Sequence, residues 1–131
     1  MRLGLNAEVV NDRAKLLTHR ILARQLSVDP DLIERARQII SKQRSVGRSY
    51  SFLDEWEQLL NLEPSTLRRL ITERSENMAR LRISSPLGLA SGLFTEDEAL
   101  RRRILRKAKL GLMLSSKRQA GAESTSMAPA A

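Results

Sequence analysis

Helix start and stop signals divide this sequence into short segments, and they are densest over residues 51–92. Asn61 tolerates the left-handed conformation that ends a helix, and Pro64 suits the first position of the next one. Ser75 is a good N-cap, whereas Pro86 disfavours helical geometry in the residue before it. The sequence therefore predicts several short helices joined by tight connections.

The apolar residues between these signals recur at helical spacing, as at Leu53, Trp56 and Leu60. Aromatic residues make up only 3% of the chain, and no segment alternates as a strand does. We expect helices over about residues 6–26, 30–43, 51–61, 64–71, 75–82 and 95–112. The predicted fold is all-α, a compact bundle of five to six short helices.

The length of 131 residues suits one domain with a modest core. We place the helical domain at residues 1–114. Residues 115–131 are small and polar apart from Met127, so they bury too little surface to offset the entropy of ordering. We expect this segment to form a disordered C-terminal tail.

Several kinds of chemistry lack the residues that they need. The chain has no cysteine, and a single histidine, His19, cannot form a multi-histidine metal site. The glutamates fall in helix-surface positions beside basic residues, and there is no glycine-rich phosphate loop. No run approaches the ~20 apolar residues of a membrane span, and the start of the chain lacks a secretory signal. We expect a cytoplasmic protein that is not an enzyme and has no metal or cofactor.

The positive charge is concentrated toward the end of the sequence. The net charge is +8, from 23 basic and 15 acidic residues, and eight of the basic residues lie between Ala99 and Arg118 with no acid among them. Removing these eight leaves 15 basic against 15 acidic residues, so the rest of the chain is neutral. Such a run could bind phosphates or an acidic partner. The alternative is a solvated helix face that complements the helix dipole.

Two segments are candidates for contact with nucleic acid. One is the basic last helix, and the other is a helix-turn-helix-like corner over residues 51–71, whose second helix would face DNA. The candidate contacts are Ser65, Thr66, Arg68 and Arg69 in the corner and Arg102, Arg103 and Arg106 in the last helix. Against the DNA interpretation, Glu57 occupies a position where the first helix normally needs a small residue. A plain helical corner is therefore the alternative.

The segment after residue 83 is unusually apolar for a connection between helices. Because a proline restrains it, we expect it to lie against the domain as a loop and to offer a docking surface to a protein partner. The candidate docking residues are Ser84, Ser85, Pro86, Leu87, Leu89, Leu93 and Phe94.

Residues 72–77 resemble the inhibitory-helix motif of antitoxins that block Fic-type AMP-transferring toxins. In that motif a glutamate pairs with an active-site arginine, and the matching positions here are Thr72, Glu76 and Asn77. Because Ser75 is a good helix cap, Thr72 and Glu76 would lie on either side of a helix break.

Trp56 to Phe94 also resembles a set of small bacterial proteins that share a spaced pattern of short motifs. The matching positions are Trp56, Leu59-Leu60, Leu70-Ile71-Thr72, Ser75-Glu76, Leu81-Arg82 and Ser84-Ser85-Pro86. This chain departs from the pattern at Leu87, where the pattern has Phe, and it adds the basic helix. The resemblance implies a companion of a toxin or accessory gene.

Two functional hypotheses follow. The first is a small non-enzymatic interaction or regulatory protein of a bacterial cytoplasm, antitoxin-like, with a toxin or accessory protein as its partner. The alternative is a helix-turn-helix-type DNA-binding regulator that uses residues 64–71 and the basic last helix.

Overall fold

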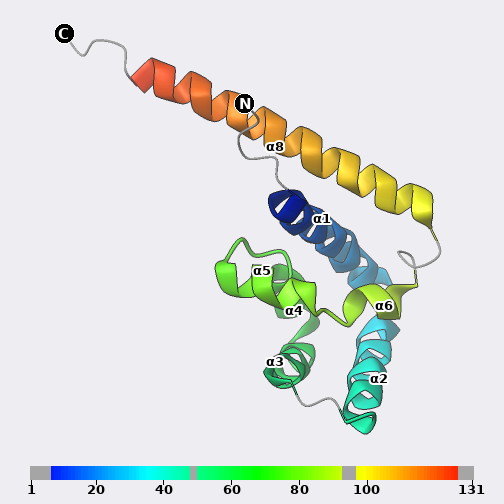
Figure 1. Ribbon diagram of the computed structural model, residues 1–131. Coiled ribbons are helices and arrows are strands. Elements are labelled where there is room, and N and C mark those ends of the chain that lie inside the picture. Colours follow the sequence, from blue (N-terminus) through cyan, green and yellow to red (C-terminus); the bar gives the residue numbers. More distant parts are fainter. Residues whose placement is uncertain (1–6, 48–49, 93–96, 127–131) are drawn as a thin grey trace.

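The computed structural model describes residues 7–47, 50–92 and 97–126, with side chains as far as Ser115. All regular secondary structure in these residues is helical, which confirms the all-α prediction. The helices are α1 (Ala7–Val28), α2 (Asp31–Ser45), α3 (Ser51–Leu60), α4 (Pro64–Leu70), α5 (Glu76–Ile83), α6 (Leu87–Ser91) and α8 (Glu98–Ser126) (Figure 1). No helix of the described residues is long and apolar enough to cross a membrane.

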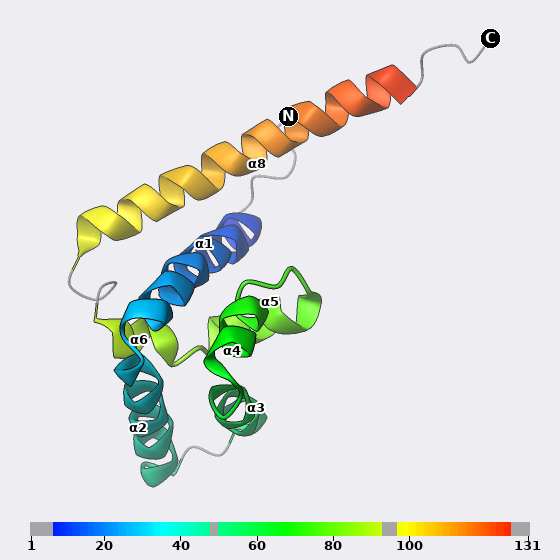
Figure 2. The ribbon, with the colours of Figure 1, turned by 180° about the vertical axis from the view of Figure 1, so that it is seen from behind.

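Helix α1 is the centre of the arrangement. Figures 1 and 2 show α8 running along one side of α1, while α4, α5 and α6 lie on its other side. Residue contacts join α1 to each of these four helices and to α2. Helix α6 packs mainly on α2, and α3 contacts both α2 and α4.

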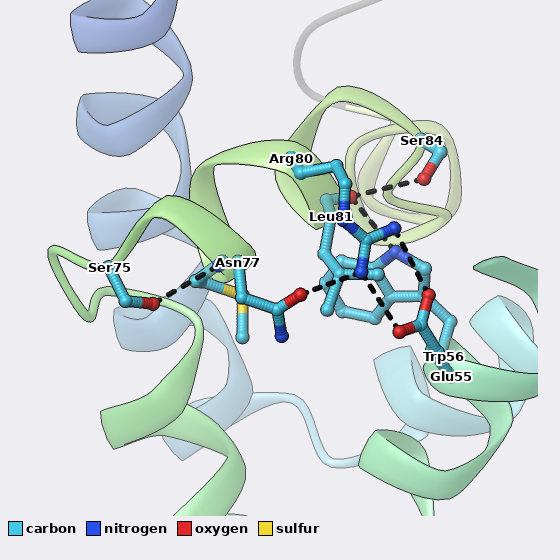
Figure 3. Close-up of polar contacts among 8 residues, drawn as sticks. Glu55, Trp56, Ser75, Asn77, Arg80, Leu81 and Ser84 are labelled. Atoms are coloured by element: carbon cyan, nitrogen blue, oxygen red, sulfur yellow. Dashed lines mark hydrogen bonds and ion pairs between the residues drawn. The ribbon is translucent and has the colours of Figure 1, made fainter.

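Trp56 of α3 occupies the middle of the main core and is 0% exposed. Its indole Nε1 donates a hydrogen bond of 2.9 Å to the carbonyl oxygen of Leu81 in α5 (Figure 3). Beside it, the Arg80 guanidinium binds both carboxylate oxygens of Glu55 at 2.9 and 3.2 Å. The large side chains that are fully buried with Trp56 are Leu22, Leu32, Leu53, Leu60, Leu67, Ile71 and Leu87.

Arginines from other segments bind carbonyl groups at the ends of three short helices. A helix leaves its last four carbonyl groups without partners inside the helix, so a short helix needs such bonds from outside. The bonds run from Arg35 Nε to Ala90 O (3.0 Å), from Arg37 Nη2 to Leu60 O (3.0 Å) and from Arg82 Nη1 to Ile71 O (3.0 Å). These contacts fix α6, α3 and α4 relative to the helices that supply the arginines.

The helix boundaries agree with several of the sequence signals. Ser75 caps α5, because its side-chain oxygen accepts a hydrogen bond of 3.1 Å from the backbone nitrogen of Met78. At the start of α8, Asp97 Oδ1 accepts a bond of 2.9 Å from the Leu100 nitrogen. Residue 95, where we expected this helix to begin, lies outside the described residues.

One connection of the predicted fold contains a helix. Residues 87–91 form α6 where we expected a loop, because Pro86 has a helix-compatible φ of −77° and Gly92 can adopt the φ of +76° that ends the turn. The backbone of α8 is helical to Ser126, so this helix continues past residue 114, where we placed the end of the helical domain.

Replacing Trp56 with Phe should lower the free energy of unfolding by about 2 kcal/mol, because it removes a buried hydrogen bond and leaves unfilled volume. Urea unfolding followed by circular dichroism measures this change. Tyr50→Phe is the matched control, since Tyr50 is exposed and its substitution should change stability by less than about 0.5 kcal/mol. Equal stability of the Trp56→Phe variant and the parent chain would contradict the central role of this side chain.

Candidate functional site

Helices α3 and α4 follow one another and are in contact at the expected corner, but only part of the predicted DNA-facing side of α4 is exposed. Ser65 and Arg69 of α4 are exposed, whereas Thr66 and Arg68 are half-buried. Glu57 does not lie between α3 and α4, although its position in the sequence suggested that it would hinder their packing. Its carboxylate is exposed and lies 2.6 Å from the guanidinium of Arg44 at the end of α2.

The two sets of candidate nucleic-acid contacts do not form one surface. The α4 set lies on one side of α1, and the α8 set, represented by Arg102, Arg103 and Arg106, lies on the opposite side (Figures 1 and 2). A duplex in contact with one set would therefore have the body of the protein between it and the other.

The expected docking segment is largely part of the fold. Pro86 and Leu87 are buried, and Leu87 belongs to the main core. Ser85 is half-buried, and its side-chain oxygen accepts a bond of 3.2 Å from the Leu87 nitrogen. Half-buried Ser84 donates from Oγ to the Leu81 carbonyl at 3.2 Å.

The prediction that this segment is a docking surface therefore needs correction, because buried side chains cannot reach a partner. Leu89 is the one described apolar member of the set that is exposed. Leu93 and Phe94 lie outside the described residues.

The outward side of α8 carries a continuous row of side chains that we call the outer stripe. The inward side is marked by Ile104 and Ala108, which are buried against the body. The outer stripe comprises Arg103, Arg106, Lys107, Leu110, Met113 and Leu114, all of which are exposed. Arg103, the pair Arg106 and Lys107, Leu110, and the pair Met113 and Leu114 follow one another at intervals of three or four residues, which places them on one face of the helix.

The composition of the outer stripe changes along the helix. Its first half is cationic, and Arg103, Arg106 and Lys107 form no ion pair with any residue that the structure describes. Its second half is apolar, with Leu110 55% exposed and Met113 45% exposed. By contrast, Arg102 lies beside the stripe and pairs with Glu98 at 2.8 Å.

A second feature is a cavity of about 620 Å³ where α1 and α8 meet α5 and α6. The basic side chains that line it are Lys15 and His19 of α1, Arg82 of α5 and Arg101 of α8. No acidic side chain is among its lining residues. Its other walls are mostly small or aliphatic, including Leu89, Ile104 and Leu105.

His19 is only 3% exposed, and its ring stacks on Trp56 with a centroid separation of 6.4 Å. Its Nδ1 lies 2.8 Å from the carbonyl oxygen of Lys15, so Nδ1 carries the proton of the neutral ring. Its Nε2 is buried and has no hydrogen-bond partner in the described residues. Burial, together with the nearby charges of Arg82 and Lys15, lowers the pKa of His19 to about 4.

Arg82 is the other buried basic residue, with 5% of its surface exposed. Its Nη1 donates to the carbonyl oxygens of Ile71 at 3.0 Å and Glu73 at 2.9 Å, while its Nε has no partner in the described residues. Burial lowers the pKa of the Arg82 guanidinium; the charge of Asp12 acts against this shift, and that of Arg20 adds to it. The sequence pattern contained Arg82 but did not indicate that it would be buried.

Other candidate chemistry finds no support in the geometry. Thr72 lies in the turn after α4, whereas Glu76 is the first residue of α5, so the Fic-type motif is interrupted by the helix break. Among the described residues, no group of three or more His, Asp or Glu side chains could hold a metal ion.

Comparison of the chain with protein-family models, with curated proteins and with solved structures found no match.

The buried His19 should make the protein less stable in acid. Its pKa in the folded state, about 4, lies below its ordinary value of 6.5, so the unfolded chain takes up the proton first as the pH falls. The stability that depends on neutral His19 is complete above pH 6.5 and is lost as the pH falls toward 4, by up to about 3 kcal/mol. Urea unfolding over this pH range, in parallel with His19→Phe, measures the effect.

The His19→Phe variant keeps a ring against Trp56 but has no group that titrates. Its unfolding free energy should therefore depend less on pH between 6.5 and 4 than that of the parent chain. Parallel pH profiles for the two proteins would exclude a neutral buried histidine as the cause.

Proposed function

We propose that this chain is a small non-enzymatic binding protein whose outer stripe on α8 docks into a groove of a partner protein. The observation that carries the proposal is the exposure of Leu110, Met113 and Leu114 on one face of a helix. Three aliphatic side chains at i, i+3 and i+4 match the anchor spacing of helices that bind in apolar grooves.

The cationic half of the outer stripe specifies the charge of the partner. Arg103, Arg106 and Lys107 precede the apolar anchors by one to three turns on the same face. Since no described acid pairs with them, their charge is available to an acidic rim at one end of the groove. Complementary charge of this kind speeds association and fixes the direction in which the helix lies.

An apolar groove with an acidic end can be formed by a protein surface but not by nucleic acid. A phosphate backbone would meet the cations but would offer no apolar contact to Leu110, Met113 and Leu114. The resemblance of Trp56 to Phe94 to companions of toxin genes supplies the class of partner that we propose, a toxin or accessory protein of the same bacterial cytoplasm. We therefore propose α8, and not residues 84–94, as the surface that docks to the partner.

Affinity purification of the tagged full-length chain from its native host tests the proposal. The parent chain should retain one partner in stoichiometric amount. Both Leu110→Ser/Met113→Ser/Leu114→Ser and Arg103→Glu/Arg106→Glu/Lys107→Glu should lose it by about tenfold or more, because each removes half of the contact. Quantitative mass spectrometry gives the ratio of partner to bait.

The matched control is Val28→Ser/Val46→Ser, which changes two exposed aliphatic residues away from α8. It should retain the partner, and all variants should unfold within a few degrees of the parent because the altered side chains are exposed. Retention of the same partner by both α8 variants, or capture of no stoichiometric protein, would refute the proposal.

Nucleic acid is the second candidate partner, because four exposed cations of α8, Arg103, Arg106, Lys107 and Lys109, have no described acid beside them. If phosphates are bound, affinity for a DNA duplex should fall steeply with salt, by about one power of the salt concentration for each phosphate contact. Arg103→Gln/Arg106→Gln/Lys107→Gln should weaken this binding, whereas Arg68→Ala/Arg69→Ala should leave it unchanged. A gel-shift series across salt concentrations measures both, and greater loss from the α4 pair would place the contact at α4 instead.

A further inference from the structure

Exposed apolar side chains from three helices line the cavity where α1 and α8 meet α5 and α6. They are Ile83 of α5, Leu89 of α6 and Leu105 of α8, and they are 64%, 58% and 39% exposed. Single exposed apolar residues are ordinary on a protein surface, but a group of them around one hollow is typical of a binding surface. The cavity of about 620 Å³ therefore offers apolar surface that the fold itself leaves in water.

Gly88 of α6 keeps one wall of this cavity open. It lies inside a helix, where glycine is less favourable than alanine. Its backbone does not require glycine, because the described glycines with a positive φ are Gly47 and Gly92. Close packing does not require it either, since a Cβ built on Gly88 meets no other atom within 4 Å. The absent side chain thus leaves space beside the cavity wall that a larger residue would fill.

The charged groups that reach the cavity are cationic. Lys15 of α1 and Arg101 of α8 line it, and Lys15 is half-buried while Arg101 is exposed. Lys15 forms no ion pair with any residue that the structure describes. None of the described lining residues is acidic, and Asp12 of α1 is not among them. A hollow lined by charges of one sign attracts a ligand of the opposite sign, so an anionic group is favoured here.

We propose that this cavity binds a small organic acid in which one carboxylate is joined to an aliphatic chain. The carboxylate lies beside Lys15 and Arg101, and the chain lies along the exposed aliphatic side chains. Small-molecule sites combine mostly apolar walls with a few polar groups in this way, and their volumes of about 300–1,000 Å³ include that of this cavity. A carboxylic acid loses its proton well below neutral pH, so the charge that Lys15 attracts is present near pH 7.

Calorimetric titration of the full chain with hexanoate and decanoate, below the concentrations at which they form micelles, tests the proposal. Decanoate should bind in a saturable way and about tenfold or more tightly than hexanoate, because its longer chain buries more apolar surface. Decylammonium has the same chain with a positive head group and should bind at least about tenfold more weakly than decanoate. No saturable binding of decanoate, or equal affinity for decanoate and decylammonium, would overturn the proposal.

Substitution of Gly88 locates the aliphatic chain. Gly88→Phe fills space beside the cavity wall without changing the charge, so it should weaken decanoate binding about tenfold or more. Gly88→Ala is the matched control, because it adds one methyl group at the same position and should change the affinity by less than about threefold. Both variants should unfold at or above the temperature of the parent, since each replaces a helical glycine with a better helix former. Equal decanoate affinity in Gly88→Phe and the parent would refute the site.

Substitution of Lys15 locates the carboxylate. Lys15→Met should weaken decanoate binding about tenfold, since it removes one charge from the wall of the cavity. Lys42→Met is the matched control on the exposed side of α2 and should change the affinity by less than about twofold. Equal loss in the two variants would show attraction to the net charge alone and would contradict a carboxylate beside Lys15.

This inference is independent of the docking surface proposed for α8. The variant Leu110→Ser/Met113→Ser/Leu114→Ser alters none of the residues that line the cavity and should bind decanoate as the parent does. Loss of decanoate binding in that variant would place the acid on the outer stripe and overturn the assignment of the cavity.

Discussion

The body of this fold depends on arginine side chains that donate hydrogen bonds to carbonyl groups at the ends of its short helices. Helices of five to ten residues, such as α3, α4 and α6, leave a large share of their carbonyl groups without partners inside the helix. Arg35, Arg37 and Arg82 donate to carbonyls at these three ends from other parts of the chain. The arginines thereby replace part of the regular hydrogen bonding that longer helices would supply, and they tie neighbouring helices together.

This use of arginine separates the basic residues into two groups. Within the body, Arg35, Arg37, Arg44, Arg80 and Arg82 bind carbonyl or carboxylate oxygens. Arg35 also pairs with Asp29 at 2.8 Å and holds the pKa of that carboxyl below its usual range. On the outer stripe of α8, the cations have no described acidic partner. The net charge of +8 therefore reflects the α8 surface much more than the body, and this is why we assign the binding role to α8.

Local patterns in the sequence predicted where most helices lie, but not which of their side chains are buried. The cap at Ser75 and the apolar spacing around Trp56 depend on neighbours in sequence, so both could be predicted. The burial of His19 and Arg82 depends on where α1, α5, α6 and α8 meet, which no local pattern records. Leu87 illustrates the same limit. Its apolar character was visible, but only the packing of α6 against α2 distinguishes a core residue from a docking residue.

The pairing of α1 with α8 has a consequence for the order in which the fold forms. These helices are separated along the chain by all the others, so their contact closes a longer loop than that of any other helix pair, including α2 with α6. During synthesis, α1 emerges before any part of α8. Val10 and Leu16 of α1, which are buried in the folded chain, therefore stay exposed until later segments pack against them. Docking of α8 is thus expected as a late step of folding, and it is this step that encloses the cavity.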